Sequence, residues 1–410
     1  MRRASSTLVL GTIKYQKLKA HVVKLVNTLH SGCSELKLLE VRVFSWALAI
    51  RFLTGFFFIY MRIVFIHTNP FHQELENLIV DINACFNFND FKLFEFQYED
   101  FKWYKPLHLL KLRRFVKEND IDIIHTFDYL DAYYALLASR GLNVKVVYSC
   151  YSYHDNISTF YKRIFKTVLS KAHAVIFPTE TQRNIMVSKY NIHKQKVFKL
   201  SHAFDAKKFD DAKYESIRDE FFIDDFRYLI GSAADFSPEH DVLNVLQMVK
   251  KLRKTGRNFT CIIAGDELEE YESYYDECKY YYLVHGLDNY IAFTGRRNDV
   301  ANFMSQLDAF VYHSDNEAVA LPVIEAMLSG VNVVVNDNEM IREITFNGKY
   351  ATLYNSNDTS DFAEKTRQIL FDLDDYKMIA QTVKEECRDI YSIEKHVLGL
   401  KEIYLKLKQY

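Results

Sequence analysis

Residues 308–335, DAFVYHSDNEAVALPVIEAMLSGVNVVV, constrain the fold of this 410-residue chain more than any other segment. Residues 308–312 are a short apolar run that is typical of a β-strand, and the polar residues after them favour a loop. Pro322 fits the first turn of a helix, and Gly330 is the expected end of that helix. The β-branched run at 331–335 suits a strand that is covered on both faces. The order strand, loop, helix, strand predicts a parallel α/β sheet.

Two carboxylates stand eight positions apart in this segment, Glu317 in the loop and Glu325 in the first part of the helix. The helix start, formed by Leu321, Pro322 and Val323, offers N–H groups and a dipole that favour a phosphate. A carboxylate accepts hydrogen bonds from the hydroxyl groups of a ribose or a sugar. Two glutamates at this spacing also occur by chance, and a glutamate near a helix start ordinarily complements the dipole. The residues around the pair favour a site for a phosphorylated, hydroxyl-rich ligand.

The segment resembles the E-x7-E signature of the retaining nucleotide-sugar glycosyltransferases of family 4, which have the GT-B fold. The shared features are a Leu-Pro pair, Glu-Ala-Met and a Gly before a valine-rich strand, whereas Ala318 and Ala320 stand where the family commonly has Gly. The resemblance implies an α/β fold with two Rossmann-like, doubly wound parallel-sheet domains that face a central cleft. It also implies that Glu317 contacts hydroxyls of the donor sugar and that Glu325 binds the ribose.

From Met61 onward the sequence alternates between strand-like and helix-like segments, as a doubly wound parallel sheet requires. The resemblance extends over most of residues 61–410, through stretches such as HAVIFPTETQRNIM and FTGRRNDVANFMSQLDAFVYHS. We expect an extension at 1–60, an acceptor domain at 61–205, a nucleotide-sugar donor domain at 206–392, and a C-terminal helix at 393–410 that returns to the N-terminal domain.

The predicted elements follow this division. Besides 308–312 and 331–335, the predicted strands are 62–67, 122–126, 144–149, 174–178 and 196–200 in the first domain and 227–232, 260–265 and 290–294 in the second. Besides the helix that ends at Gly330, the predicted helices are 107–118, 129–139, 160–171, 180–190, 239–254 and 393–407.

Residues 1–60 differ from the rest of the chain in charge, because they hold nine Lys or Arg residues against two Glu residues, a net charge of +7. Residues 43–60 are apolar, but Arg51 lies in their middle, where a charge opposes membrane insertion. Met61 begins MRIVFIHTNP, which reads as a natural N-terminus followed directly by a strand. We expect residues 1–60 to be a mis-called start or a poorly ordered extension, and a membrane-attached helix is the alternative.

The chain departs from the family pattern where the donor diphosphate is expected. The resemblance implies an Arg and a Lys, five positions apart, after the first strand of the second domain, but GSAADFSPEHDVL has Asp235 and His240 there. An Asp is unfavourable beside a diphosphate, and a histidine is at most partly charged near neutral pH. Either another cation substitutes, or the donor is bound differently, or the protein is weakly active. Arg296 and Arg297 are the nearest candidates for donor binding, and a solvated helix start is their alternative interpretation.

Several histidines follow predicted strands of the first domain. His67 and His72 lie in the loop HTNPFHQEL, which lacks the Gly-rich turn that the family often has, and they are candidates for contact with the acceptor. His154, in the loop YSYHDN, lies near the place where the resemblance implies a catalytic histidine close to the reacting sugar. Ordinary polar loop residues are the alternative interpretation for all three. His125 is expected to pack at the end of its strand.

Charge and cysteine content bear on partners and location. The formal net charge of −2 does not favour nucleic acid as a partner. The six cysteines show no CxxC pair and no metal-ligand spacing, which fits reduced thiols in the cytoplasm. No Asp-x-Asp motif lies in a suitable loop and no His/Cys cluster occurs, so we expect no metal ion and no cofactor, the nucleotide sugar being a substrate.

Two predicted helices of the first domain are strongly basic. They could rest on an anionic membrane, which would suit a lipid-linked acceptor at the inner face of the plasma membrane. A solvated helix face is the alternative interpretation. The cations are Lys111, Arg113, Arg114 and Lys117 in one helix and Lys162, Arg163, Lys166 and Lys171 in the other.

The sequence therefore predicts a retaining glycosyltransferase that moves a sugar from a nucleotide-sugar donor to a glycan or lipid-linked glycan acceptor. The expected setting is the synthesis of a cell-surface polysaccharide, such as a capsule, an exopolysaccharide or a lipopolysaccharide. Two alternatives stay open, a non-catalytic GT-B scaffold or partner protein and a GT-B nucleotide-sugar epimerase. Asp235 and His240 favour the scaffold, and the intact pair Glu317 and Glu325 opposes it.

Overall fold

The computed structural model describes residues 61–68, 78–82, 91–98, 106–154, 157–210, 215–315 and 317–408. Residues 61–410 form one compact unit. The predictions for residues 1–60 and for His72 lie outside the described residues, as does the side chain of His67.

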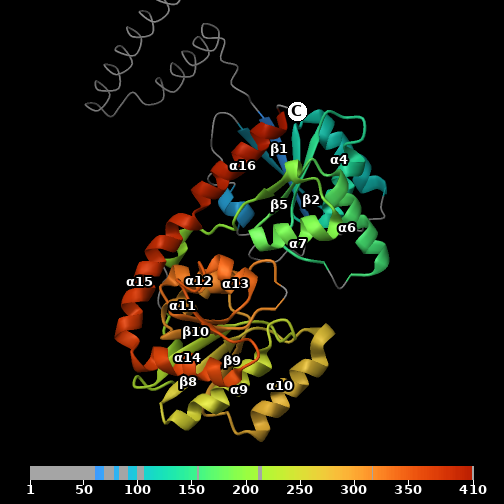
Figure 1. Cartoon of the computed structure of the whole chain (residues 1–410). Coiled ribbons are helices and arrows are strands. Elements are labelled where there is room, and N and C mark those ends of the chain that lie inside the picture. The colour runs from blue at the N-terminus through green and yellow to red at the C-terminus, as the bar shows by residue number, and fades with distance from the viewer. Residues whose placement is uncertain are drawn as a thin grey trace, which may run out of the picture. The chain divides into compact units, whose positions relative to one another are not determined.

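The first sheet consists of six parallel strands in the order β2-β1-β3-β4-β5-β6. Helices between successive strands flank it (Figure 1). The strands are β1 (Met61–Thr68), β2 (Phe91–Tyr98), β3 (Ile123–Thr126), β4 (Lys145–Ser149), β5 (Ala174–Phe177) and β6 (Val197–Lys199). The helices are α4 (Pro106–Glu118), α5 (Tyr129–Ala138), α6 (Thr159–Lys171), α7 (Glu180–Tyr190) and the 3-10 turn η1 (Lys194–Lys196).

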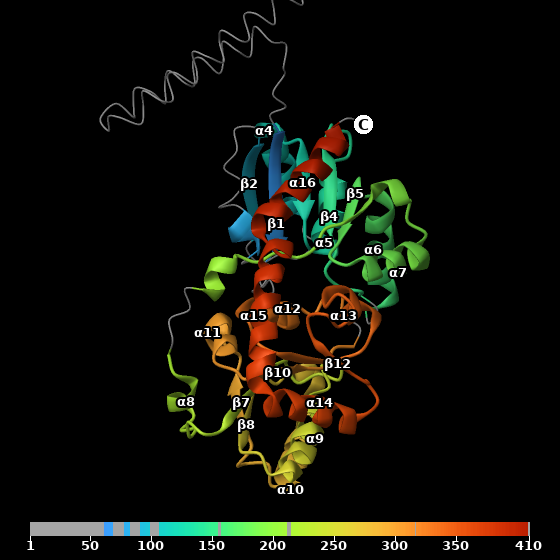
Figure 2. The ribbon, with the colours of Figure 1, turned by 60° about the vertical axis from the view of Figure 1, so that its left-hand side comes forward.

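Alternate residues of β1 pack on opposite faces of the first sheet, because successive side chains of a strand point to opposite sides. Ile63 and Phe65 belong to the core beneath the C-terminal helix, whereas Val64 and Ile66 belong to the core beneath α4 and α5. Helix α16 (Ile393–Lys408) lies along the first sheet in both views (Figure 1 and Figure 2). It contributes Ile393, Val397, Leu400, Ile403, Tyr404 and Leu407 to that core.

The second sheet also has six parallel strands, in the order β12-β11-β10-β7-β8-β9. They are β7 (Tyr228–Ala233), β8 (Phe259–Ala264), β9 (Ile291–Gly295), β10 (Ala309–Tyr312), β11 (Val333–Asn336) and β12 (Thr352–Tyr354). The helices are α8 (Ile217–Glu220), α9 (Val242–Leu252), α10 (Glu272–Val284), α11 (Val300–Ser305), α12 (Leu321–Ser329), α13 (Glu339–Ile344), α14 (Thr359–Phe371) and α15 (Leu373–Ile390). The 3-10 turns are η2 (Ala206–Phe209), η3 (Arg253–Thr255) and η4 (Glu269–Tyr271).

Each sheet changes the direction of its strand order beside its first strand, between β1 and β3 in one and between β7 and β10 in the other. Ligands of such sheets bind outside the carboxyl ends of the strands at this switch point. The loop after β7 holds His240, and the segment after β10 holds Glu317. The second switch point therefore brings together two loops that the sequence singled out separately.

The ten predicted strands are all present, with ends that differ from the predictions by a few residues. Helix α9 begins at Val242 rather than at residue 239, because the Asp241 side chain accepts a hydrogen bond from the N–H of Asn244 and caps the helix there. The edge strands β2 and β12 were not predicted, although FKLFEFQY of β2 is rich in the aromatic residues that strands favour. The short helices α8, α11 and α13 and the longer helices α10, α14 and α15 were also not predicted.

Two further properties concern the described part of the chain. None of its helices combines the length and the apolar character that crossing a bilayer requires. Its free thiols are all buried, at Cys150, Cys261, Cys278 and Cys387.

Candidate active site at the second switch point

Helix α12 follows the geometry that its residues predict. Pro322 is its second residue, and Gly330 ends it in the left-handed conformation at φ 76°. The N–H of Val331 bonds to the carbonyl of Ala326 at 3.1 Å, so Val331 still belongs to the C-terminal hydrogen bonding of the helix and cannot pair in a strand. For this reason β11 begins at residue 333 and not at residue 331.

The two ends of the Glu frame differ in their environment. Glu325 is half-buried on α12, one turn into the helix. At the helix start Leu321 and Pro322 are half-buried, whereas the side chain of Val323 is fully buried, so only its backbone could meet a ligand. The N-cap residue, Ala320, has no side-chain acceptor for the first N–H groups of this helix, which are therefore candidates for binding an anion.

Glu317 is held by two hydroxyl groups at the carboxyl end of β10. The Tyr312 hydroxyl donates to Oε1 at 3.2 Å, and the Ser314 hydroxyl donates to Oε2. The Tyr312 side chain is buried, while the Glu317 side chain is 19% exposed. Two fixed donors therefore orient a carboxylate that still reaches the surface of the site.

His240 joins the same cluster from the loop after β7. Its Nδ1 lies 3.1 Å from the Tyr312 hydroxyl and 3.7 Å from Oε1 of Glu317. Burial lowers the pKa of His240, nearby His313 lowers it further, and the Asp235 carboxylate opposes both effects by raising it. The imidazole is therefore mainly neutral near pH 7.

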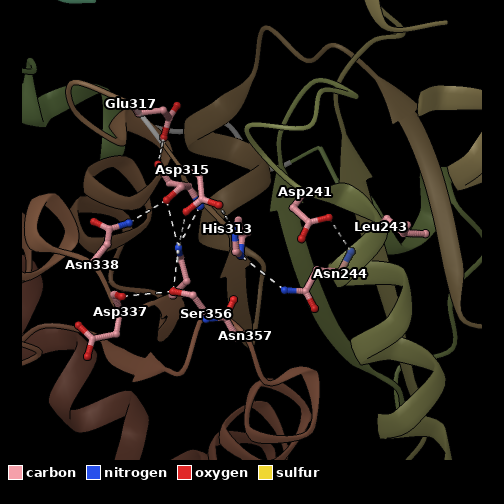
Figure 3. A network of polar contacts seen from close by, with 12 residues as sticks. Asp241, Leu243, Asn244, His313, Asp315, Glu317, Asp337, Asn338, Ser356 and Asn357 are labelled. Atoms are coloured by element: carbon pink, nitrogen blue, oxygen red, sulfur yellow. Dashed lines mark hydrogen bonds and ion pairs between the residues drawn. The ribbon is translucent and has the colours of Figure 1, made fainter. Parts of the chain in front are cut away.

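A layer of polar side chains fixes the backbone of the loop that carries Glu317. The Asn336 amide receives the N–H of Ser314 at 2.9 Å and donates to the Ser314 carbonyl at 3.1 Å, and Asn338 donates to the same carbonyl at 2.8 Å. His313 bonds to Asp315 at 3.0 Å (Figure 3). The sequence analysis missed these residues, and the run of Asn, Asp and Ser directly after each strand was the available signal.

Asp235, which stands where the family pattern has Arg, pairs with Arg296. The Arg296 guanidinium donates to Asp235 at 2.7 Å and lies 3.7 Å from Asp266. The other oxygen of Asp235 accepts from the N–H of Asp266, and Asp266 accepts from the N–H of Arg296. Arg296 is 56% exposed, so its charge is partly balanced and still open to solvent. The structure thus pairs Arg296 with the residue that stands where the family pattern has Arg, and donor binding by Arg296 stays a prediction.

Arg297 lies in a different environment from its neighbour. Its guanidinium forms two hydrogen bonds with Asp299, at 2.9 and 2.8 Å, and a third with Glu220, at 2.9 Å. Its side chain is only 12% exposed. These contacts favour a structural role, and donor binding by Arg297 stays a prediction.

The described candidates of the first domain, His154 and His125, lie at the first sheet. His154 adopts a left-handed φ of 55° and packs its ring against Tyr129 and Phe165, with Nε2 at 3.4 Å from the Tyr148 hydroxyl. His125 is fully buried and bonds to the Ser149 and Tyr404 hydroxyls, as expected of a packing residue. The catalytic role of His154 stays a prediction.

Within the part of the chain that the structure describes, no group of three or more His, Cys, Asp or Glu side chains is arranged to hold a metal ion.

The chain was compared with known proteins. The family model "Glycosyltransferase Family 4" matches residues 63–208, and the model "Glycosyl transferases group 1" matches residues 213–386. The N-acetyl-alpha-D-glucosaminyl L-malate synthase of Bacillus anthracis is 23% identical over 190 residues, which are 46% of this chain and 48% of that protein. The match thus spans about half the length of this curated relative.

Solved structures with low sequence identity share the fold. A glycosyltransferase from Rickettsia africae ESF-5 has a TM-score of 0.70 at 17% identity, over 85% of this chain and 98% of that one. Anabaena Alr3699/HepE in complex with UDP and glucose has a TM-score of 0.71 at 18% identity, over 86% and 100%. Sucrose-phosphate synthase from Thermosynechococcus elongatus has a TM-score of 0.70 at 13% identity, over 85% and 99%. At these identities the likeness shows the two-domain fold.

Proposed function

Because the chain belongs to the GT-B glycosyltransferases of the group 1 and family 4 type, we propose that it transfers a sugar from a nucleotide-sugar donor to an acceptor hydroxyl with retained anomeric configuration. The observation that carries this proposal is the Glu317 carboxylate, oriented by the Tyr312 and Ser314 hydroxyls at the second switch point. Retention itself rests on the resemblance of the Glu frame. The donor is a substrate in this proposal, and the reaction needs no metal ion and no other cofactor.

Glu317 and Glu325 bind different parts of the donor. A carboxylate oxygen accepts more than one hydrogen bond, so Glu317 can hold a sugar hydroxyl while Tyr312 and Ser314 fix its orientation. Glu325, half-buried one turn into α12, accepts from the ribose hydroxyls. Because fixed acceptors hold the donor at both of its ends, its anomeric carbon is oriented for attack.

The leaving diphosphate gains negative charge as the sugar departs. The N–H groups at the start of α12, beginning at Leu321, stabilise that charge through hydrogen bonds and the helix dipole. Arg296 adds a cation from the loop after β9, and His240 adds a hydrogen-bonding group beside Glu317. Together they stand in for the Arg and Lys that the family pattern places after β7.

The acceptor belongs to the first sheet in this proposal, with His67, His72 and His154 on the acceptor side. A glycan or lipid-linked glycan acceptor places the reaction in cell-surface polysaccharide synthesis, in the cytoplasm at the membrane face. Helix α4 supports membrane contact, because Leu107 and Leu110 are 60% and 61% exposed. The exposed cations of the same helix are Lys111, Arg114 and Lys117. Cosedimentation with anionic but not with neutral vesicles is the expected result.

A non-catalytic partner protein is the second candidate function. The ion pair between Asp235 and Arg296 favours it, because the carboxylate balances a cation that the diphosphate would need. A nucleotide-sugar epimerase remains as a third candidate, distinguished by conversion of the donor without an acceptor. Transfer or donor hydrolysis would exclude the partner-protein role.

The first experiment is a thermal-shift screen of residues 61–410, with the full chain in parallel, against UDP-, GDP-, ADP-, CMP- and dTDP-sugars. A ligand that binds the native state raises the melting temperature by mass action. We expect a shift with one nucleotide and start with UDP-glucose, because Anabaena Alr3699/HepE was also solved with UDP-glucose. A folded sample that shifts with none of the donors would overturn the transferase proposal and favour the partner-protein role.

A further inference from the structure

His240 is the end of a hydrogen-bonded relay of three side chains. Its Nδ1 lies 3.1 Å from the Tyr312 hydroxyl, and that hydroxyl lies 3.2 Å from Oε1 of Glu317. Tyr312 has one proton to give, and the carboxylate is the stronger acceptor. The Tyr312 hydroxyl therefore donates to Glu317, and its oxygen accepts the Nδ1–H of His240.

This relay assigns the tautomer of the neutral imidazole. With its proton on Nδ1, His240 has Nε2 as its basic nitrogen. Nε2 forms no hydrogen bond to any residue in the part of the chain that the structure describes. The His240 side chain is 21% exposed, so a proton from solvent can reach it.

The surroundings of His240 are rich in carboxylates. Asp235 acts on its charge from the loop after β7, and Glu317 lies 3.7 Å from Nδ1 in the segment after β10. Arg296 reaches the same loop, but Asp235 and Asp266 already balance part of its charge. His313 is the other nearby titratable base. The remaining acidic groups on these loops are Glu239 and Asp241 beside His240 in sequence and Asp315, whose N–H bonds to the Glu239 carbonyl.

A nucleotide diphosphate brings two more negative charges into this setting. Of the basic groups in the cluster, Arg296 is charged and paired with carboxylates, whereas His240 can gain a charge. A diphosphate beside Nε2 favours the protonated ring in the same way that an adjacent carboxylate does. Protonation of Nε2 adds an N–H donor for the diphosphate. It also adds a positive charge that offsets the repulsion between the diphosphate and the nearby carboxylates.

We propose that donor binding is coupled to proton uptake at Nε2 of His240, so that the imidazolium forms with the complex and hydrogen-bonds the diphosphate. The proton comes from solvent, and no covalent bond of the donor changes in this step. The inference rests on the proposed function, because it assigns the diphosphate of a nucleotide sugar to the second switch point. It predicts that donor affinity falls as pH rises, by up to about tenfold per unit once the free ring is neutral.

Titration calorimetry with UDP-glucose at pH 7, or with the sugar nucleotide that the screen selects, measures the coupling directly. A nucleotide sugar suits this test because neither of its phosphates titrates near neutrality. The observed binding enthalpy is plotted against the ionisation enthalpy of several buffers, and its slope gives the protons taken up. We expect about half a proton or more for each donor bound by the native chain.

Two substitutions of His240 assign the proton. His240→Gln should abolish the proton uptake and weaken donor binding. His240→Lys should also abolish the proton uptake, but it should bind the donor more tightly than His240→Gln because a lysine is already charged. His193→Gln is the matched control, since His193 is exposed on η1's flank and should leave the uptake unchanged. Uptake that persists in both His240 variants would overturn the inference.

The outcomes separate this inference from the proposed function. Native protein that binds the donor without proton uptake overturns the coupling and leaves the transferase proposal standing. Native protein that binds none of the donors overturns both. Uptake that is lost in either folded His240 variant, and retained in the His193 control, supports the coupling.

Discussion

Asp235 and Arg296 form an ion pair of 2.7 Å that joins the loop after β7 to the loop after β9. The pair explains how an Asp can stand where the family pattern has a diphosphate-binding Arg. The Arg296 guanidinium comes from a position 61 residues later in the chain than Asp235, which holds it by a hydrogen bond. This arrangement separates the two neighbouring arginines into a candidate ligand-binding residue and a structural residue, and each has a measurable consequence.

Arg296→Ala should weaken donor binding more than it weakens the fold. Its side chain is 56% exposed, so loss of the ion pair should cost less than about 1 kcal/mol of unfolding free energy. Loss of a charged contact to the diphosphate should raise the donor Kd about tenfold, or ~1.4 kcal/mol. Calorimetry with the donor and urea unfolding measure the two effects.

Arg297→Ala should show the reverse pattern and is the matched comparison. Its guanidinium is 12% exposed and bonds to Asp299 and Glu220, so its loss removes the cation from both carboxylates and leaves Asp299 with the Asn302 amide. We expect a loss of about 2–3 kcal/mol in unfolding free energy with little change in donor Kd. Equal effects of the two variants on donor binding would contradict the distinction.

Glu317→Gln should reduce turnover with little loss of stability. The Gln carbonyl oxygen can still accept from a hydroxyl of Tyr312 or Ser314, so the loop should stay folded. The variant loses the negative charge beside the reacting sugar, and we expect kcat to fall about a hundredfold. Glu325→Gln should raise KM for the donor instead. A large fall in melting temperature for Glu317→Gln, with unchanged kcat, would assign that residue a structural role.

Motif residues could be predicted from the sequence because their chemistry and spacing are local. Glu317, Pro322 and Gly330 lie within one strand–loop–helix segment, and each has a local role in a loop, a helix start or a helix end. The buried strands could be predicted in the same way, because a run of β-branched residues indicates a strand without information about which segments pack against it. This local information fixed the α/β order of the chain.

Contacts between distant segments could not be predicted in this way. The pairing of Asp235 with Arg296 depends on two strands of a sheet whose order the sequence does not state. The hydrogen bonds of Tyr312 to Glu317 and His240 depend on the direction of a side chain at the end of β10. Glu343 contacts Glu180 and Thr181 of α7, which precede it by 163 and 162 positions in the sequence.

Glu343→Ala should destabilise the fold through loss of a helix cap. The Glu343 carboxylate, on α13, accepts from the N–H groups of Glu180 and Thr181 at 2.7 and 2.8 Å and from the Thr181 hydroxyl at 2.9 Å. A carboxylate at a helix N-terminus satisfies N–H groups that have no partner in the helix and complements the dipole. We expect a loss of about 1–2 kcal/mol, measured by urea unfolding.

Glu339→Ala is the control for this prediction, because Glu339 is exposed in the first turn of the same helix. It should change the unfolding free energy by less than about 0.5 kcal/mol. If the two variants lost similar amounts of unfolding free energy, the contact of Glu343 with α7 would contribute no stability beyond the effect of a Glu-to-Ala change on the helical propensity of α13.

Stability should fall in acid because three histidines are buried as neutral rings at α16, with His396 on the helix and His125 and His202 close to it. Burial, with the nearby His396 as a second cause, lowers the pKa of His125 and of His202 to about 3, and burial lowers that of His396 to about 4. Unfolded chains bind a proton at each of these rings near pH 6.5, whereas the folded chain does not. This contribution to stability is therefore complete above about pH 6.5 and is lost as the pH falls toward about 3, by about 2 kcal/mol for each ring at pH 5.

His202→Leu tests this origin of acid sensitivity. Both ring nitrogens of His202 are buried without a hydrogen-bond partner among the described residues, so the variant loses no such bond. At pH 7.5 its unfolding free energy should be unchanged or higher, because an unsatisfied polar group leaves the core. Between pH 7.5 and pH 5 its urea midpoint should fall by about a third less than that of the native chain, since one of three titrating rings is gone. The same fall in both proteins would mean that other groups cause the acid sensitivity.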